Sequence, residues 1–232
     1  MLATGNAHKL GEFRSILAPH EVQAMPAGIE LPPEGIESFE ANAIGKACGL
    51  AEALTARTQP TDEASAVPSI VIADDSGLEV QGLGWEPGVI SARYAGEDAD
   101  DRDNYELLLR RLDGAPPESR RARFVCVLAA VVPAALLVPG SGTPGTPYPA
   151  APAREPLVYA VRGEWWGIIT RQPHGDGGFG YDPVFLPDGS DLTVAQLPQS
   201  VKDQASHRAL AGRALLERFE KEGVRGVGQP VS

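Results

Sequence analysis

Apolar residues recur at helical spacing in four parts of this chain. Intervals of three and four residues between apolar side chains predict amphipathic helices over residues 10–17, 39–54, 101–112 and 206–223. Ser38 immediately precedes the second helix and Ser206 opens the fourth, so each offers a side-chain oxygen to cap its first turn. Gly223 follows the fourth helix and is expected to end it.

Short, continuous apolar runs lie between these helical patterns. β-Branched and aromatic residues in such runs predict strands over residues 70–73, 124–132, 157–162 and 167–170. Leu2 and Ala3, ahead of the first helix, are too few to form a full strand. Strands that alternate with helices predict the α/β class.

The strand over residues 70–73 runs directly into two adjacent carboxylates, Asp74 and Asp75, and then into Ser76 and Gly77. We expect the strand to end at this acidic pair. Two neighbouring acids repel each other and are costly to desolvate unless a cation or hydrogen bonds compensate them. Asp, Ser and Gly are also ordinary turn residues, so a simple turn and a metal or acid–base site both remain open here.

Composition limits the classes of protein to consider. The 232 residues are enough for one domain with a substantial core, and hydrophobic and charged residues at 43% and 22% are typical of a soluble protein. A net charge of −11 argues against a broad nucleic-acid surface. The longest apolar run, residues 124–138, is interrupted by Pro133 and is shorter than the ~20 residues that span a bilayer.

We therefore expect a cytoplasmic protein with no membrane partner and a single domain over residues 1–232. No signal-peptide pattern is visible at the amino terminus, and two cysteines, Cys48 and Cys126, suit a reducing compartment. Residues 139–156 are rich in Pro, Gly, Ser and Thr, which predicts a surface insertion.

Thr4, Gly5 and Asn6 lie where the chain enters the first helix, and Lys9 follows within its first turn. Free amides and the positive end of the helix dipole suit an anion at this place. An ordinary turn with a surface lysine is the alternative. Farther along, Asn42 and Lys46 share one face of the second helix, and spacing alone favours a solvated position for both.

Residues 175–180 contain a Gly-x-Gly-x-x-Gly pattern. A dinucleotide-binding loop of this kind opens a helix, whereas Pro183 disfavours a helix here. The glycines instead allow the backbone to approach a flat ligand, with Phe179 and Tyr181 as stacking faces. A Gly-rich hairpin with two core aromatics is the alternative.

Lys202, His207 and Arg208 lie just before and within the first turn of the last helix. Cations at a helix amino terminus oppose the helix dipole, at roughly 0.3–1 kcal/mol each when exposed. A bound anion or a carbonyl-bearing ligand would remove this conflict, and a solvated basic turn is the alternative.

Taken in order, six short motifs resemble the inosine triphosphate pyrophosphatase family, from about residue 2 to residue 220. The motifs are Thr4-Gly5-Asn6 with Lys9, Phe39 with Asn42-Ala43 and Lys46-Ala47, Asp74-Asp75-Ser76-Gly77-Leu78, Pro87-Gly88 with Ser91-Ala92-Arg93-Tyr94, Gly178-Phe179-Gly180-Tyr181-Asp182-Pro183, and Lys202 with Ser206-His207-Arg208.

The resemblance implies a curved mixed β-sheet flanked by helices, with an active-site cleft between two lobes, in a homodimer. It also implies a Mg²⁺-dependent hydrolase that converts ITP, dITP or XTP to the monophosphate and pyrophosphate. A nucleotide-binding or sensing protein of the same fold, without turnover, is the alternative function.

By resemblance, Asp75 is the proton acceptor and a metal ligand, with Asp74 beside it. Glu34 matches the second metal carboxylate better than its rival Glu37. The implied substrate-binding residues are Thr4, Gly5, Asn6, Lys9, Lys46, Ser76, Phe179, Gly180, Tyr181, Asp182, Lys202, His207 and Arg208. Donors from His207, Arg208 or nearby amides would pair with the O6 acceptor of hypoxanthine or xanthine and disfavour the N6 amino group of adenine.

Overall fold

A computed structural model describes residues 1–57, 69–137 and 155–225. The helices are α1 (Ala7–Ile16), α2 (Phe39–Arg57), α3 (Asp101–Arg111), α4 (Gln199–Ala205) and α5 (His207–Lys221). The strands are β1 (Val71–Val80), β2 (Arg121–Val132), β3 (Leu157–Ile169) and β4 (Phe185–Pro187). The predicted insertion over residues 139–156 lies outside the described residues, except for its last two positions.

The four strands form one sheet in the order β1-β2-β3-β4, and each neighbouring pair is antiparallel. Parallel pairing occurs at single bridges, which join Leu2 to Ile72 and to Ala24. The short apolar start of the chain, at Leu2 and Ala3, therefore forms isolated bridges. The α/β class with a helix-flanked sheet is therefore confirmed, and the mixed character of the sheet comes from Leu2.

The predicted helix caps at Ser38, Ser206 and Gly223 are also confirmed. The Ser38 hydroxyl accepts a hydrogen bond from the Ala41 amide at 3.0 Å, and the Ser206 hydroxyl accepts one from Ala209 at 3.2 Å. Gly223 takes a left-handed conformation, with φ 66°, just after α5. Within the described residues, no helix is both long enough and apolar enough to span a membrane.

The expectation that the first strand ends at the acidic pair is wrong. Strand β1 continues to Val80, and Asp74 and Asp75 pair with Leu128 and Val127 of β2. The turn interpretation fails with it. Gly77 keeps the strand close to its neighbours, because a Cβ there would lie 2.4 Å from the Ser91 hydroxyl.

Two further elements differ from the prediction. The two strands expected over residues 157–162 and 167–170 are one strand, β3, because β2 pairs with it over its whole length. Helix α4 has no counterpart in the apolar pattern, since its buried position is the lysine Lys202.

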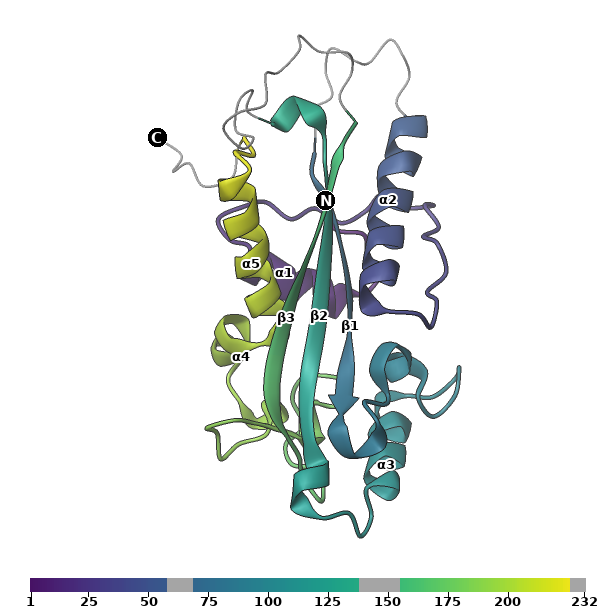
Figure 1. The fold of residues 1–232 in the computed structure, drawn as a ribbon, viewed down its shortest axis with the longest axis vertical. Helices are drawn as coiled ribbons and strands as arrows, with labels where there is room; N and C mark the ends of the chain where they lie inside the picture. The colour runs from purple at the N-terminus through teal and green to yellow at the C-terminus, as the bar shows by residue number, and fades with distance from the viewer. Residues whose placement is uncertain (58–68, 138–154, 226–232) are drawn as a thin grey trace.

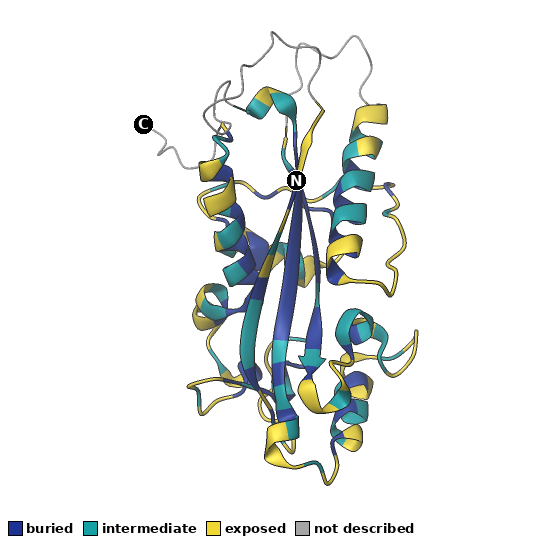
Figure 2. Ribbon diagram, viewed as in Figure 1, coloured by how far each residue is buried: buried dark blue, intermediate teal, exposed yellow. Residues whose placement is uncertain are grey.

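The two faces of β1 and β2 carry different helices. Ile72, Cys126 and Leu128 face a core formed with α1 and α5. Val71, Ala73 and Val127 face a core formed with α2. Figure 2 shows the result, with β2 buried along most of its length between the helices.

Helices gather at both ends of the long strands. Helices α1, α2 and α5 lie toward one end, and α3 lies at the other (Figure 1). A third core joins α3 to the far end of the sheet through Leu78, Leu108 and Phe124. The acidic pair of β1 lies between these two groups of helices.

Gly163 sets how closely α5 approaches β3. A Cβ at this position would lie 2.2 Å from the His207 carbonyl oxygen and 2.5 Å from the Ala211 amide nitrogen. Both atoms belong to the backbone of α5, so neither can rotate away. The side-chain-free surface of Gly163 is therefore required for the helix to pack.

We predict that Gly163→Ala lowers the free energy of unfolding by about 2–3 kcal/mol through overpacking. Urea denaturation monitored by circular dichroism measures the change. Gly11→Ala is the matched control, because Gly11 is exposed in α1 and has no atom within 4 Å of an added Cβ. The control is expected to be neutral or to stabilise by up to ~1 kcal/mol. Equal stability of Gly163→Ala and the parent would contradict the prediction.

Candidate active site

A cavity of about 350 Å³ lies beside the acidic pair of β1. Most of the predicted site residues line it: Thr4, Gly5, Asn6, Lys9, Glu34, Lys46, Asp75, Ser76, Phe179, Gly180, Tyr181, Asp182, His207 and Arg208. Glu37 lines a different and larger cavity, of about 440 Å³, between the start of α2 and Trp85. The larger cavity lacks Lys9, Lys46 and Arg208 among its described lining residues, so the smaller one is the candidate active site.

The amino end of α1 borders this cavity. The Asn6 side-chain oxygen accepts hydrogen bonds from the amides of His8 and Lys9, at 2.9 and 3.2 Å, and so caps the helix. The Thr4 hydroxyl accepts a bond from the Asn6 amide at 3.1 Å. The Lys9 ammonium extends from the first turn and lies 2.8 Å from an Asp74 carboxylate oxygen.

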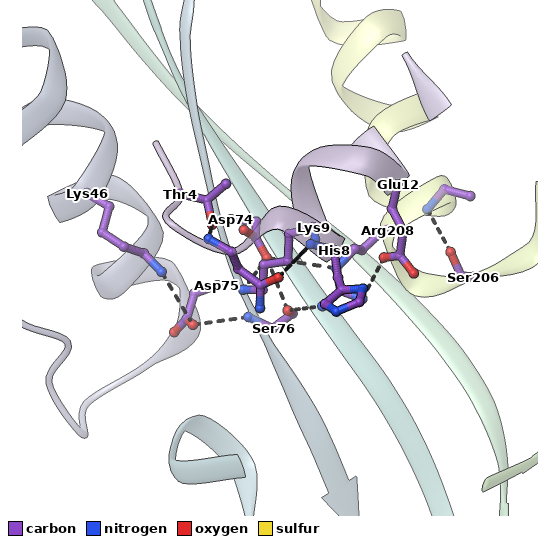
Figure 3. Close-up of polar contacts among 12 residues, drawn as sticks. Thr4, His8, Lys9, Glu12, Lys46, Asp74, Asp75, Ser76, Ser206 and Arg208 are labelled. Carbon is purple, nitrogen blue, oxygen red and sulfur yellow. Dashed lines mark hydrogen bonds and ion pairs between the residues drawn. The ribbon is translucent and has the colours of Figure 1, made fainter. Parts of the chain in front are cut away.

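Asp74 points to the α1 and α5 side of the sheet, where it is buried. Lys9 forms its closest ion pair, the Arg208 guanidinium lies 3.9 Å away, and the Ser76 hydroxyl donates to it at 3.1 Å. Burial alone would raise the pKa of this carboxyl, but the charges of Lys9, Arg208 and Lys46 outweigh it and lower the pKa to about 2. Asp74 therefore stays ionised. Figure 3 shows it beside Lys9.

Asp75 is the next residue of the strand and points to the α2 side. It accepts hydrogen bonds from the Asn42 amide group at 2.8 Å and from the Ser76 backbone at 3.1 Å, and the Lys46 ammonium lies 3.7 Å away. Burial raises the pKa of Asp75 above its ordinary value, despite the opposing charge of Lys46. The expectation that Asn42 and Lys46 are solvated is wrong, because this carboxylate holds both in the interior.

Glu34 approaches the same lysine from the opposite side. Its carboxylate accepts a hydrogen bond from the Lys46 ammonium at 2.6 Å and lies 4.0 Å from Arg93. Glu34 and Asp75 thus flank one cation and border one cavity. Within the described residues, no three His, Cys, Asp or Glu side chains form a complete metal-binding group. Two carboxylates nevertheless suit Mg²⁺, which keeps several waters and binds phosphate oxygens.

Glu12 is a buried residue of the site that the sequence pattern did not single out. One of its oxygens lies 2.8 Å from the Lys202 ammonium, and the other accepts a hydrogen bond from the Arg208 guanidinium at 3.0 Å. An acidic residue directly before the core residue Phe13 was the available signal. Figure 3 shows Glu12 extending from α1 toward Arg208.

These contacts change the interpretation of the three residues near the last helix. Lys202 lies in the last turn of α4, where a cation is favourable, and Arg208 is paired by Glu12. His207 stacks on Phe124 at 4.9 Å between ring centroids, and burial lowers the pKa of its imidazole well below the ordinary value, so it is neutral. Protein carboxylates and burial, without a bound anion, therefore remove the conflict with the helix dipole.

The glycine-rich loop, residues 175–180, places the Phe179 ring against the cations of Lys202 and Arg208. The Lys202 ammonium and the Arg208 guanidinium lie 4.6 and 5.1 Å from the centre of the ring. The His8 ring stacks on Phe179 at 5.7 Å. Tyr181 is buried, as the hairpin alternative expected, whereas Phe179 borders the cavity.

The buried Asp182 binds the backbone of this loop. Its carboxylate accepts hydrogen bonds from the Phe179 amide at 3.1 Å and from the Lys202 ammonium at 2.8 Å. Burial raises the pKa of Asp182, with Lys202 opposing that shift. Lys202 is not among the described residues that line the cavity beside Asp75. Together with Phe179 it lines a neighbouring cavity of about 390 Å³.

Comparison with known sequences identifies relatives over nearly the whole chain. The model of the Ham1 family matches residues 1–218. The dITP/XTP pyrophosphatase of Nocardia farcinica is 41% identical over 227 residues, covering 93% of this chain and 92% of the relative. The dITP/XTP pyrophosphatase of Methylacidiphilum infernorum is 35% identical over 228 residues, covering 97% and 96%.

Solved structures agree with these sequence matches. The Ham1 protein of Staphylococcus aureus has a TM-score of 0.69 and 35% identity, covering 95% of this chain and 97% of its own. A nucleoside-triphosphatase, or dITP/XTP pyrophosphatase, of Mycobacterium abscessus has a TM-score of 0.62 and 36% identity, covering 94% and 97%.

We predict that Asp74→Asn lowers the free energy of unfolding at pH 7 by about 2–3 kcal/mol, given the native pKa of about 2 and an unfolded value of ~3.9. Because the native pKa is the lower one, this stabilisation is present above the unfolded pKa. It is lost as the pH falls toward the native pKa.

Urea titrations of parent and variant between pH 7 and pH 3 measure this difference. It is expected to shrink steadily below about pH 5. Asp98→Asn, at an exposed position, is the control and should match the parent at every pH. A difference that stays constant down to pH 3 would be inconsistent with the Asp74 ion pairs as its source.

Proposed function

The chain belongs to the Ham1 family, and we propose that it is a Mg²⁺-dependent nucleoside triphosphate pyrophosphohydrolase. Its substrates are the non-canonical purine nucleotides ITP, dITP and XTP, which it cleaves to the monophosphate and pyrophosphate. The observation that carries this proposal is the single cavity in which Asp75, Glu34 and Lys46 lie together with Lys9 and Arg208. The names of the relatives from Nocardia farcinica and Methylacidiphilum infernorum support the same reaction.

The cations of the cavity suit a triphosphate. Such a substrate carries about four negative charges at neutral pH, and its hydrolysis requires positive groups that neutralise developing charge. Lys9, at the positive amino end of α1, binds phosphate oxygens from one side, and Lys46 binds them from the other. Asn6 keeps the α1 turn in shape by capping the helix.

Asp75 and Glu34 would hold Mg²⁺, which would neutralise the triphosphate and help to orient it when bound. Asp75 is also the general base. Its raised pKa makes it a stronger proton acceptor than an ordinary aspartate, and it receives the proton of the water that attacks the α-phosphorus. Asp74 stays ionised and holds Lys9 and Arg208 in place.

The base is recognised on the Phe179 side of the cavity. Phe179 offers a stacking face, and Arg208 and His207 are the nearby groups for the purine edge. A donor from either residue pairs with O6 of hypoxanthine or xanthine and leaves the amino group of adenine unpaired. Discrimination against ATP follows from this polarity.

The family resemblance further supports a cytoplasmic homodimer that removes these nucleotides from the nucleotide pool. Nucleic acid is not a partner in this proposal, since the net charge of −11 opposes binding to a polyphosphate backbone.

We predict that the purified protein releases pyrophosphate from ITP, dITP and XTP at least tenfold faster than from ATP, and only with Mg²⁺. A coupled pyrophosphate assay with and without EDTA measures both requirements. Release of inorganic phosphate in place of pyrophosphate, or equal turnover of ATP, would refute the proposal. ITP binding by calorimetry without any product identifies the alternative, a binding or sensing protein.

Asp75→Asn is the negative control for this assay. The amide keeps the size of the side chain but cannot accept a proton, so turnover should fall by about 10²–10⁴-fold. Unchanged unfolding would show that the loss is chemical. Activity near that of the parent would exclude Asp75 as the base.

We predict that Glu34→Gln raises the Mg²⁺ concentration needed for half-maximal activity by about tenfold, because it removes a charged metal ligand. Glu37→Gln is the matched control, since Glu37 lines the other cavity and should leave the requirement unchanged. Titration of Mg²⁺ at saturating ITP measures both. A larger effect in the Glu37 variant would reverse the assignment.

A further inference from the structure

Asp101, the first residue of α3, contacts the glycine-rich loop from the far side of the cavity. Its carboxylate accepts a hydrogen bond from the Gly180 amide at 2.7 Å, across 79 positions of sequence. Both residues line the cavity that holds Asp75. The proposed chemistry assigns no role to Asp101.

The loop around Phe179 has an unusual backbone. Gly178 and Gly180, on either side of Phe179, have φ of 76° and 61°, values that favour glycine. A Cβ at Gly178 would lie 2.1 Å from an Asp182 carboxylate oxygen. Glycine loses more conformational freedom on folding than other residues, so hydrogen bonds from outside the loop help to hold it in one conformation.

Two carboxylates provide that support at consecutive amides. Asp182 accepts a hydrogen bond from the Phe179 N–H, and Asp101 of α3 accepts one from the Gly180 N–H. These two amides bracket the Cα of Phe179. The direction in which the phenyl ring leaves the backbone is therefore set by both acids.

Asp101 belongs to a unit that hydrogen bonds tie together. Asn104 of α3 binds the Ala92 carbonyl at 3.1 Å and the Ala95 amide at 2.8 Å, which ties α3 to the segment after β1. The same segment accepts a hydrogen bond from the Tyr181 hydroxyl at the Ser91 carbonyl, at 2.8 Å. The loop is thus attached to this unit at two neighbouring residues, Gly180 and Tyr181.

We propose that Asp101 is a positioning residue for nucleotide binding, which holds the Gly180 amide so that Phe179 presents its ring to the purine base. This inference rests on the proposed function for its substrate. In this proposal Asp101 affects the binding of the purine base and not the reaction at the phosphates. Asp182 differs from it in being buried against Lys202, so Asp101 is the anchor that can be removed without disturbing the buried ion pairs.

Kinetics of Asp101→Ala, Asp101→Asn and Asp103→Ala test the proposal. Asp103 is the matched control, because it lies in the same turn, is also exposed, and accepts one backbone N–H, that of Asp100. Asp101→Ala should raise the KM for ITP on the order of tenfold, as expected for loss of a hydrogen bond to a charged group. Its kcat and its inhibition by inorganic tripolyphosphate, which has no base, should stay within twofold of the parent.

Asp101→Asn keeps an acceptor oxygen and should recover most of the loss, and Asp103→Ala should match the parent. An unchanged KM in Asp101→Ala would overturn the proposal. An equal rise in the inhibition constant for tripolyphosphate would also overturn it, because Asp101 would then act on the whole site.

Hydrogen exchange of the Gly180 amide in the ligand-free protein gives a readout that needs no turnover. The amide should exchange on the order of tenfold faster in Asp101→Ala than in the parent, Asp101→Asn or Asp103→Ala. Equal exchange in all four proteins would overturn the anchor. If the parent lacks ITP turnover, the proposed function fails, and the exchange result still decides the role of Asp101 in the loop.

Discussion

The structure depends on one buried network of side chains with alternating positive and negative charge. It begins at Asp74, which pairs with Lys9 and lies beside Arg208, and continues through Glu12 and Lys202 to Asp182. Most of these groups are removed from water, and a charge in that position is costly unless a partner compensates it. This network joins β1, α1, α5, α4 and the glycine-rich loop, so all five segments contribute residues to the site.

The alternation of side chains along β1 gives the two adjacent aspartates different chemistry. Successive residues of a strand point to opposite faces, so Asp74 meets Lys9 and Arg208 while Asp75 meets Asn42 and Lys46. The first environment lowers the pKa of a carboxyl to about 2, and the second raises the pKa of its neighbour. Two chemically identical residues thereby differ: Asp74 is a fixed counter-ion, and Asp75 is the residue that we propose as the proton acceptor.

The glycine-rich loop connects this charge network to the α3 end of the molecule. Asp182 attaches it to Lys202 on the α4 side, and Asp101 and Ser91 attach it on the side of α3. Phe179 lies between these attachments, above Lys202 and Arg208. The ring that faces the cavity is therefore placed by contacts from both groups of helices, and neither group alone determines its position.

The sequence by itself determined the α/β class, the helices with apolar periodicity and caps at Ser38 and Ser206, and the order of the motifs. These features depend on residues within a turn or two of one another, so a local pattern reports them. Only the tertiary structure decided that β1 continues through the acidic pair, that Asn42 and Lys46 are buried, and that Glu12 belongs to the site. Their burial depends on partners far along the chain, such as Arg208, which binds Glu12 across 196 positions. No local pattern carries that information, because the stability of a buried charge is set by the partner that folding brings to it.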